Sequence, residues 1–245
     1  MALARAMGVT TLPTTILVDQ HGSIIGRLTG KADWDSPDAL ALNEHLNNMV
    51  KLGINHCFME VSSHSIDQRR IYGLKFDLAI FTNITHDHLN YHKTFKNYLN
   101  VKKRFFDDLD KDSISLINLD DKNANYVVQN TISKVCRLSL KKDADYRLKI
   151  IENSFMGLII KVEDQLINTQ LIGKFNAYNL LTVFSASKLL NLDSKKIFLG
   201  LSMLKNPEGR FDVIHINKIV GIVDYAHSPD ALLNVLETIS EIKNE

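Results

Sequence analysis

Residues Cys57 to Phe106 read CFMEVSSHSIDQRRIYGLKFDLAIFTNITHDHLNYHKTFKNYLNVKKRFF, and this stretch decides how the chain folds. Two short apolar runs, residues 56–61 and 78–84, each end in polar side chains. Runs bounded in this way are typical of buried strands in a parallel sheet, which is covered on both faces. Ligands of such sheets bind beyond the carboxyl ends of the strands. The sequence therefore predicts two neighbouring parallel strands that deliver polar groups to one site.

An amphipathic helix is predicted after the second polar cluster. Its apolar stripe consists of Phe95, Tyr98, Leu99, Lys102, Phe105 and Leu109. Lys102 lies inside this stripe, whereas Lys96, Lys103 and Arg104 are expected to point elsewhere. Two interpretations of Lys102 stay open. Its stem can run along the edge of the core with the amine in water, or the amine can lie beside a metal or phosphate site, where its pKa and chemistry change.

The composition sets mild bounds on fold and function. The 245 residues, 45% of them hydrophobic, suffice for one large domain or a domain and a half. A net charge of +1 argues against binding to nucleic acid. Cys57 and Cys136 both lie in apolar runs, as small core residues of a reducing compartment do. The sequence shows neither a membrane-spanning apolar run nor a signal-peptide core, so we expect a cytoplasmic protein without a membrane partner.

Five separated motifs occur in the order found in the Mur ligase family. They are MEVSSHSIDQRR (59–70), FTNITHDHLNYH (81–92), VKKRFF (101–106), GKFNAYNLLTVFSA (173–186) and the run from NPEGRFDVI (206–214) to VDYAHSPDALLNVL (223–236). The chain from about residue 36 to 245 thus resembles the central domain and the start of the C-terminal domain of these ligases. Within the family it is most similar to the ligases that add the third residue of the peptidoglycan stem peptide.

The resemblance implies an α/β fold with three segments. Residues 39–212 would form a parallel-sheet central domain, incomplete at its N-terminal side and carrying a small antiparallel subsheet between residues 135 and 172. Residues 213–245 would begin a second α/β domain. Residues 1–38 resemble instead the tail of a thioredoxin-like reductase, with an antiparallel strand pair in TTILVD (14–19) and SIIGRL (23–28). Because the chain has no Cys-x-x-Cys motif, a thiol–disulfide role is not expected, and an ordinary hairpin leading into a helix is the preferred interpretation of this segment.

The resemblance also implies roles for individual residues. Lys102 matches the lysine that carbon dioxide carbamylates, and Glu60, His88 and Lys102 would together hold magnesium. The implied substrate contacts are Ser36, Ser62, Gln68 and Arg70. The implied ATP contacts are Asn83, Asn176, Asn179, Arg210, Asp224 and His227. Because only His88 is a metal ligand in this reading, the zinc-like spacing of His88 and His92 is not taken to indicate zinc.

Some of these residues, and the nearby His64, also have a purely structural interpretation. Glu60 can be a solvated carboxylate at a strand end, and Arg70 an exposed helical charge. Asn176 can cap the helix predicted over residues 180–190. His64 can do the same for the helix that follows the first predicted strand.

The implied reaction is an ATP-dependent amide synthesis. ATP would phosphorylate the terminal carboxylate of UDP-N-acetylmuramoyl-L-alanyl-D-glutamate, and the amine of diaminopimelate or lysine would attack the acyl phosphate. Such chemistry needs a phosphate loop in which Gly-Lys precedes Ser or Thr. The two Gly-Lys pairs of this chain are followed by Ala32 and Phe175. The alternative is therefore a catalytically inactive fusion or fragment joined near residues 35–40. The sequence leaves the oligomeric state open.

Overall fold

The computed structural model describes residues 14–18, 24–29, 38–206, 209–217, 219–226 and 229–243. The predicted site residues Ser36 and His227 lie outside the described residues. Within the described part, no helix is both long enough and apolar enough to cross a membrane.

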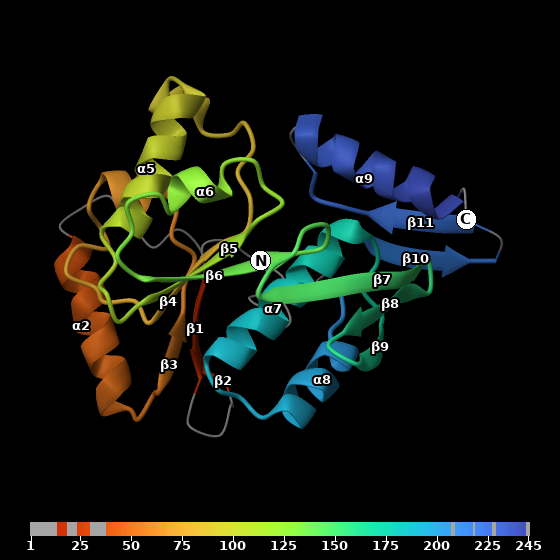
Figure 1. Ribbon diagram of the computed structural model, residues 1–245, viewed down its shortest axis with the longest axis horizontal. Helices are drawn as coiled ribbons and strands as arrows, with labels where there is room; N and C mark the ends of the chain where they lie inside the picture. The colour runs from red at the N-terminus through yellow and green to blue at the C-terminus, as the bar shows by residue number, and fades with distance from the viewer. Residues whose placement is uncertain are drawn as a thin grey trace.

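A six-stranded sheet forms the centre of the molecule, in the order β4-β5-β6-β7-β8-β9 (Figure 1). Its strands are β4 (Leu78–Phe81), β5 (Ile114–Asn118), β6 (Lys134–Ser139), β7 (Tyr146–Ser154), β8 (Gly157–Val162) and β9 (Gln165–Thr169). Strands β4 to β7 pair in parallel, whereas β7, β8 and β9 pair antiparallel. The predicted parallel sheet with a small antiparallel extension is thus confirmed.

Eight helices lie among the described residues. They are α2 (Asp38–Lys51), α3 (Ser63–Asp67), α4 (Leu89–His92), α5 (Phe95–Asp107), α6 (Ala124–Val127), α7 (Lys174–Leu189), α8 (Ser194–Met203) and α9 (Pro229–Lys243). Side-chain caps fix where several of them begin: Thr94 Oγ1 accepts from the Asn97 N–H at 3.2 Å, and Asp193 Oδ1 accepts from the Lys196 N–H at 3.1 Å. Such caps satisfy backbone donors that the first helical turn leaves unpaired.

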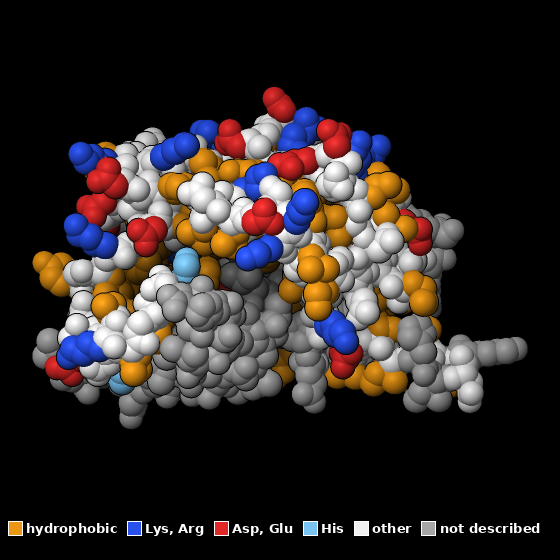
Figure 2. Space-filling view, turned by 90° about the horizontal axis from the view of Figure 1, so that it is seen from below, with side chains coloured by type: hydrophobic (Ala, Val, Ile, Leu, Met, Phe, Trp, Pro, Cys, Tyr) orange, Lys and Arg blue, Asp and Glu red, His pale blue; other side chains and the backbone are white. Residues whose placement is uncertain are grey.

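Two apolar clusters hold the helices against the sheet. In the larger cluster, α7 packs Leu180, Leu181 and Phe184 against the buried face of β5 to β9. In the second, α5 packs Phe105 and Phe106 against β4, β5 and α6. Figure 2 shows that lysine and arginine alternate with aspartate and glutamate on one face of the surface, so no single sign of charge dominates that face.

The first predicted strand does not join this sheet. Only residues His56–Phe58 form a strand, β3, and it pairs antiparallel with β1 (Thr14–Val18), which pairs antiparallel with β2 (Ile24–Thr29). The predicted hairpin of residues 14–28 is confirmed, but the expectation that residues 56–61 and 78–84 are neighbouring parallel strands is wrong. Among the described residues, β3 forms its backbone hydrogen bonds with β1. The hairpin thus supplies the hydrogen-bond partner that the backbone of β3 requires.

The end of the chain forms a second, smaller unit. Strands β10 (Asp212–Ile216) and β11 (Ile219–Val223) make a hairpin, and α9 follows (Figure 1, blue). Buried Phe211 and Ile242 pack on Ile172, which precedes α7. The strand–helix order matches the expected start of a second α/β domain, while the boundary at residues 212–213 stays a prediction.

Candidate functional site

Lys102 lies half-buried on α5 beside two carboxylates. Burial lowers its pKa, and the negative charges of Glu60 and Asp87 partly oppose that shift. Its amine lies 5.6 Å from the centroid of the Tyr98 ring. Glu60 is therefore within electrostatic reach of Lys102 although the two are far apart in the sequence. The role of Lys102 at a metal or phosphate site stays a prediction.

His88 belongs to a group of rings next to Lys102. The Tyr98 ring is near both, since its centroid lies 5.6 Å from the Lys102 amine and 5.9 Å from the centroid of the His88 ring. Burial, with the charges of Asp87 and Glu60, raises the pKa of Tyr98 to about 12, so this phenol stays neutral. The centroid of the His64 ring lies 5.0 Å from that of His88. The pKa of His64 is lowered mainly by burial and to a smaller extent by the charges of the neighbouring His88 and His92 imidazoles.

The residues around Lys102 fit magnesium only if the lysine is modified. Within the described ranges, no three histidine, cysteine, aspartate or glutamate side chains are grouped as a metal site would require. Glu60 and His88 supply two donors near Lys102, and an unmodified ammonium would repel a cation. A carbamate on Lys102 would add the oxygen donors that Mg²⁺ prefers, so the donor types fit the ion in that form.

The proposed substrate residues lie on and after the short helix α3. Ser62 is its N-cap, with Oγ accepting from the Ser65 N–H at 3.1 Å, so the suggestion that His64 caps this helix is wrong. Gln68 follows α3 and is exposed, and its side-chain oxygen accepts a hydrogen bond from the Arg70 guanidinium. Ser62, Gln68 and Arg70 thus lie along one short segment.

A hydrogen-bond relay joins the proposed ATP residues. Asn179 Nδ2 donates to Asn176 Oδ1 at 3.1 Å, and Asn176 Nδ2 donates to Asn206 Oδ1 at 3.3 Å. Asn206 Nδ2 donates in turn to the carbonyl oxygen of Phe211 at 3.0 Å. The backbone N–H of Phe211 then donates to Asp224 Oδ2 at 2.7 Å. The relay therefore runs from α7 to the loop after β11.

The remaining ATP candidates differ in how closely they join this relay. The Arg210 guanidinium lies 5.0 Å from the centroid of the Tyr225 ring, next to Asp224. Asn83 follows β4 and is exposed, and no hydrogen bond within the described part of the chain joins it to the relay. Asn176 also donates to the Ile172 carbonyl oxygen at 2.8 Å, while the N-cap position of α7 is occupied by Gly173. Asn176 therefore supports the start of α7 from inside the helix.

Sequence reasoning missed two features of the site region. Asn206 was not singled out, because its role depends on contacts with residues distant in sequence. Lys103, expected to point away from the core, is only 7% exposed, and its amine forms an ion pair with Asp107 at 2.6 Å. The i, i+4 spacing of Lys103 and Asp107 was the available signal.

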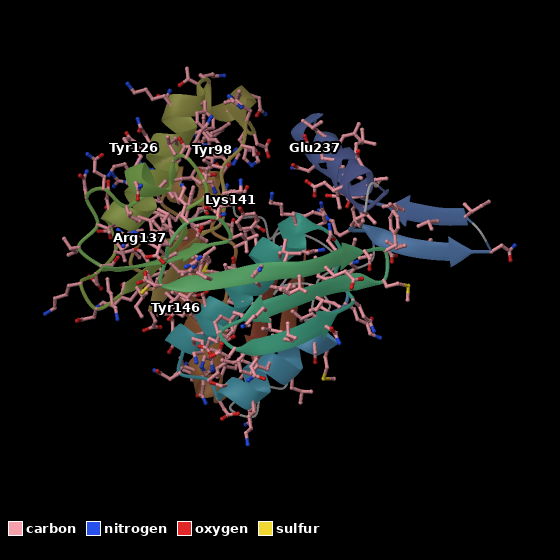
Figure 3. The ribbon with its side chains drawn as sticks, turned by 45° about the vertical axis from the view of Figure 1, so that its right-hand side comes forward. Tyr98, Tyr126, Arg137, Lys141, Tyr146 and Glu237 are labelled. Carbon is pink, nitrogen blue, oxygen red and sulfur yellow. The ribbon has the colours of Figure 1, made fainter. Side chains whose placement is uncertain are left out.

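A cavity of about 490 Å³ lies away from these residues. It is lined mainly by the first residues of β7 and the residues just before them, with Tyr146, Arg147, Lys149, Lys161 and Phe184 among its residues. Figure 3 shows Tyr146 well separated from Tyr98, which marks the Lys102 region. The cavity therefore does not coincide with the candidate site.

The architecture defines a class of protein: an α/β central domain that continues into a second α/β unit. The family model described as the Mur ligase middle domain matches residues 5–187, and the chain belongs to the Mur ligase family. This confirms the resemblance read from the motifs. The matched range begins inside residues 1–38, whose thioredoxin-like character stays a prediction.

Relatives with high identity carry one name. The UDP-N-acetylmuramoyl-L-alanyl-D-glutamate–2,6-diaminopimelate ligase of Cytophaga hutchinsonii is 50% identical over 230 residues, which are 94% of this chain and 47% of that protein. The ligase of the same name from Clostridium perfringens is 36% identical, over 92% of this chain and 48% of the relative. The chain thus spans about half the length of the curated relatives it matches.

Solved structures agree with the fold. A structure of a UDP-N-acetylmuramoyl-L-alanyl-D-glutamate–2,6-diaminopimelate ligase superposes with a TM-score of 0.72 at 30% identity, covering 89% of this chain and 46% of that one. The MurF ligase from Thermotoga maritima, solved in complex with ADP, has a TM-score of 0.60 at 20% identity, covering 74% of this chain and 42% of that one. The second likeness concerns the fold alone.

Proposed function

We propose that this chain supplies residues that bind the metal ion, the substrate and the nucleotide in an ATP-dependent ligase of peptidoglycan precursor synthesis. The reaction joins an amino acid to UDP-N-acetylmuramoyl-L-alanyl-D-glutamate. The names of the relatives favour diaminopimelate over lysine as that amino acid. The observation that carries the proposal is Lys102, a half-buried lysine whose pKa is lowered by burial and whose neighbours include Glu60.

The lowered pKa of Lys102 favours the reaction of its amine with carbon dioxide. A larger fraction of neutral amine is present at a given pH, and the neutral amine is the form that adds carbon dioxide. The resulting carbamate is an anion, which with Glu60 and His88 would hold Mg²⁺. Bound there, the ion would offset negative charge between ATP and the substrate carboxylate.

Other residues would bind and orient the reactants. The planar guanidinium of Arg70 offers paired donors to a carboxylate or phosphate, and Ser62 and Gln68 lie on the same segment. On the nucleotide side, the relay from Asn179 to Asp224 would hold α7 and the second unit in a fixed arrangement around ATP. The two free cysteines, Cys57 and Cys136, suit the reducing cytoplasm in which we place this reaction.

A second candidate function is substrate binding without turnover. The observation that favours it is the sequence of the two Gly-Lys pairs, neither of which is followed by serine or threonine. Without a phosphate loop in these 245 residues, the backbone amides, ammonium and hydroxyl that position ATP phosphates are not supplied.

Calorimetric titration of the chain with UDP-N-acetylmuramoyl-L-alanyl-D-glutamate tests the proposal. We expect binding by the unaltered chain and about tenfold weaker binding by Arg70→Ala, because one charge-assisted pair is lost. Arg147→Ala is the matched control, since its 3.2 Å ion pair is with Asp143, whose side chain is 98% exposed. No binding by the unaltered chain would refute the proposal, and phosphate release from ATP by the unaltered chain would refute the second candidate.

A further inference from the structure

Helix α4 contacts both the first and the last residue of α3. The chemistry proposed above uses neither contact. At the start of α3, His92 Nε2 lies 2.8 Å from Ser63 Oγ, and both side chains are buried. At its end, the Tyr91 hydroxyl donates to Asp67 Oδ2 at 3.0 Å. Two consecutive residues of α4 therefore hold the two ends of α3.

Asp67 is also held from α5. Arg104 Nη2 donates to Asp67 Oδ1 at 3.2 Å and to the carbonyl oxygen of Ile66 at 3.1 Å. Because α5 also carries Lys102, this contact fixes α3 relative to the lysine. The carboxylate of Asp67 thus accepts hydrogen bonds from two different helices.

The contacts continue toward the proposed substrate residues. Gln68 Nε2 donates to the Tyr91 hydroxyl at 3.4 Å, and the Arg70 guanidinium donates to Gln68 Oε1. A single phenol therefore contacts both the last residue of α3 and the first residue after it. Loss of that hydroxyl would remove one hydrogen bond from Asp67 and one from Gln68, and would leave the contact between Asp67 and Arg104 in place.

Helix α3 depends on such contacts because it is very short. Its five residues are far fewer than an isolated helix needs to be stable in water. Just beyond it, Arg69 has a φ of 56°, in the left-handed region, so the backbone turns sharply. The direction in which Gln68 and Arg70 point is consequently set by packing rather than by the helix itself.

Helix α4 also connects α3 to the metal side of the site. It begins directly after His88, whose φ is 55° and whose N–H donates to Asp87 Oδ1 at 2.7 Å. The Tyr91 ring lies 4.2 Å from that of His64 and 4.8 Å from that of His92. The helix is thus in contact with α3 along its length and joined covalently to His88.

We propose that Tyr91 and His92 are positioning residues, which hold the segment from Ser62 to Arg70 at a fixed place relative to His88 and Lys102. The role in substrate binding rests on the function proposed above. In this proposal, α4 holds Gln68 and Arg70 where they can contact an anionic, nucleotide-linked substrate.

Tyr91→Phe tests this inference, because it removes the hydroxyl and keeps the ring. Tyr126→Phe is the matched control: this tyrosine is 39% exposed against 36% for Tyr91, and its hydroxyl donates to Asn100 Oδ1 at 2.7 Å. We expect amide hydrogen exchange in the peptide 62–70 to rise about tenfold in Tyr91→Phe, as the loss of a hydrogen bond to a charged group implies. The control should leave exchange in that peptide unchanged.

A second pair of variants tests His92. His92→Ala should raise exchange at the start of α3, and His92→Gln should restore most of the protection, because an amide can still hydrogen-bond with Ser63. Equal exchange in all three forms would overturn the role of His92.

Substrate affinity separates positioning from simple support of the fold. UDP-N-acetylmuramoyl-L-alanyl-D-glutamate should bind Tyr91→Phe about three- to tenfold more weakly than the unaltered chain, with the same number of sites. Faster exchange with unchanged affinity would show a structural role only and overturn the inference. Failure of the unaltered chain to bind would instead refute the proposed function, and unchanged exchange in Tyr91→Phe would refute the contact between α4 and α3 independently of any ligand.

Discussion

Substitution of Asp120 by alanine should be among the most destabilising changes at a polar residue of this chain. Asp120 follows β5, and its carboxylate accepts four hydrogen bonds. The donors are Ser139 Oγ at 2.7 Å, the Leu140 N–H at 2.9 Å, the Lys141 N–H at 3.3 Å and the Tyr178 hydroxyl at 2.9 Å. The carboxylate thus joins the ends of β5 and β6 to helix α7.

The expected loss follows from what the substitution leaves behind. A hydrogen bond to a charged group contributes about 1.5–3 kcal/mol, and an unsatisfied buried donor costs about 1–3 kcal/mol. Ser139 is fully buried and Tyr178 half-buried, whereas Lys141 is exposed and can turn to water. We therefore expect Asp120→Ala to lower the free energy of unfolding by about 3 kcal/mol, and Tyr178→Phe to lower it by about 1 kcal/mol.

The same carboxylate should make stability depend on pH. Burial alone would raise the pKa of Asp120, but the hydrogen bonds from Ser139, Leu140, Tyr178 and Lys141 bring it below its usual value. A carboxyl group whose pKa is lower in the folded than in the unfolded state stabilises the fold above its unfolded pKa of about 3.9. That contribution is lost as the pH falls through the folded pKa.

Urea unfolding at pH 7 and through the range below about pH 4 measures both effects. Asp120→Ala should be less stable at pH 7 and should lose less stability on acidification than the unaltered chain. Asp143→Ala, at a side chain that is 98% exposed, is the control and should change stability by less than about 0.5 kcal/mol. A loss below about 1 kcal/mol in Asp120→Ala would show that water replaces these hydrogen bonds and would refute the reasoning.

Three further predictions concern activity and packing. The chain alone should release no phosphate from ATP above background in a colorimetric assay with magnesium, the nucleotide dipeptide and diaminopimelate, because no Gly-Lys-Ser/Thr loop is present. Asp107→Ala should lower the free energy of unfolding by about 3 kcal/mol in urea titration, since it leaves the buried Lys103 ammonium unpaired, whereas Lys103→Met should be nearly neutral. Gly157→Ala should lower the free energy of unfolding by about 3 kcal/mol or more, because a Cβ there would lie 1.9 Å from the backbone oxygen of Thr169 in the paired strand β9, and because the φ of Gly157 is 134°.

Each of these predictions has a clear contrary result. Turnover that disappears in Glu60→Ala would show that phosphate positioning comes from elsewhere in the chain. Equal losses in Asp107→Ala and Lys103→Met would mean that the ammonium finds water when its partner is removed. Gly200→Ala is the control for Gly157, since a Cβ at Gly200 meets nothing within 4 Å, and equal effects of the two would contradict the steric argument.

The sequence predicted those elements whose periodicity is set by the core. The run 78–84 became β4, and the stripe on residues 95–109 became α5, because each has one face or both faces buried. The position of residues 56–61 was not predictable in this way. A run of apolar residues indicates a strand but does not name its partner, and the hairpin β1–β2 took that place.

The two neighbouring lysines show the same limit within a correctly predicted helix. Helical spacing placed Lys102 in the apolar stripe and Lys103 outside it. In the structure Lys103 is the more buried, because α6 covers that side of α5 and the Tyr126 ring lies 5.8 Å from its amine. A four-residue helix such as α6 leaves little periodic signal in the sequence. The relay through Asn206 was hidden for a related reason, since it joins residues 30 positions apart.

The placement of β3 and β4 in different sheets changes how the candidate site is held together. Glu60 follows β3, and His88 follows β4; if these strands were hydrogen-bonded neighbours, the ladder itself would fix the distance between the two side chains. Because β3 pairs instead with β1, the distance between Glu60 and His88 depends on contacts between helices. Helix α3 follows Glu60 and helix α4 follows His88. The two helices are linked by the hydrogen bond from Tyr91 to Asp67, and Asp67 also accepts a hydrogen bond from Arg104 on α5. Helices that make few buried contacts open more readily than a sheet ladder. The geometry around Lys102 is consequently more sensitive to a single hydroxyl on α4 than a parallel-sheet site would be.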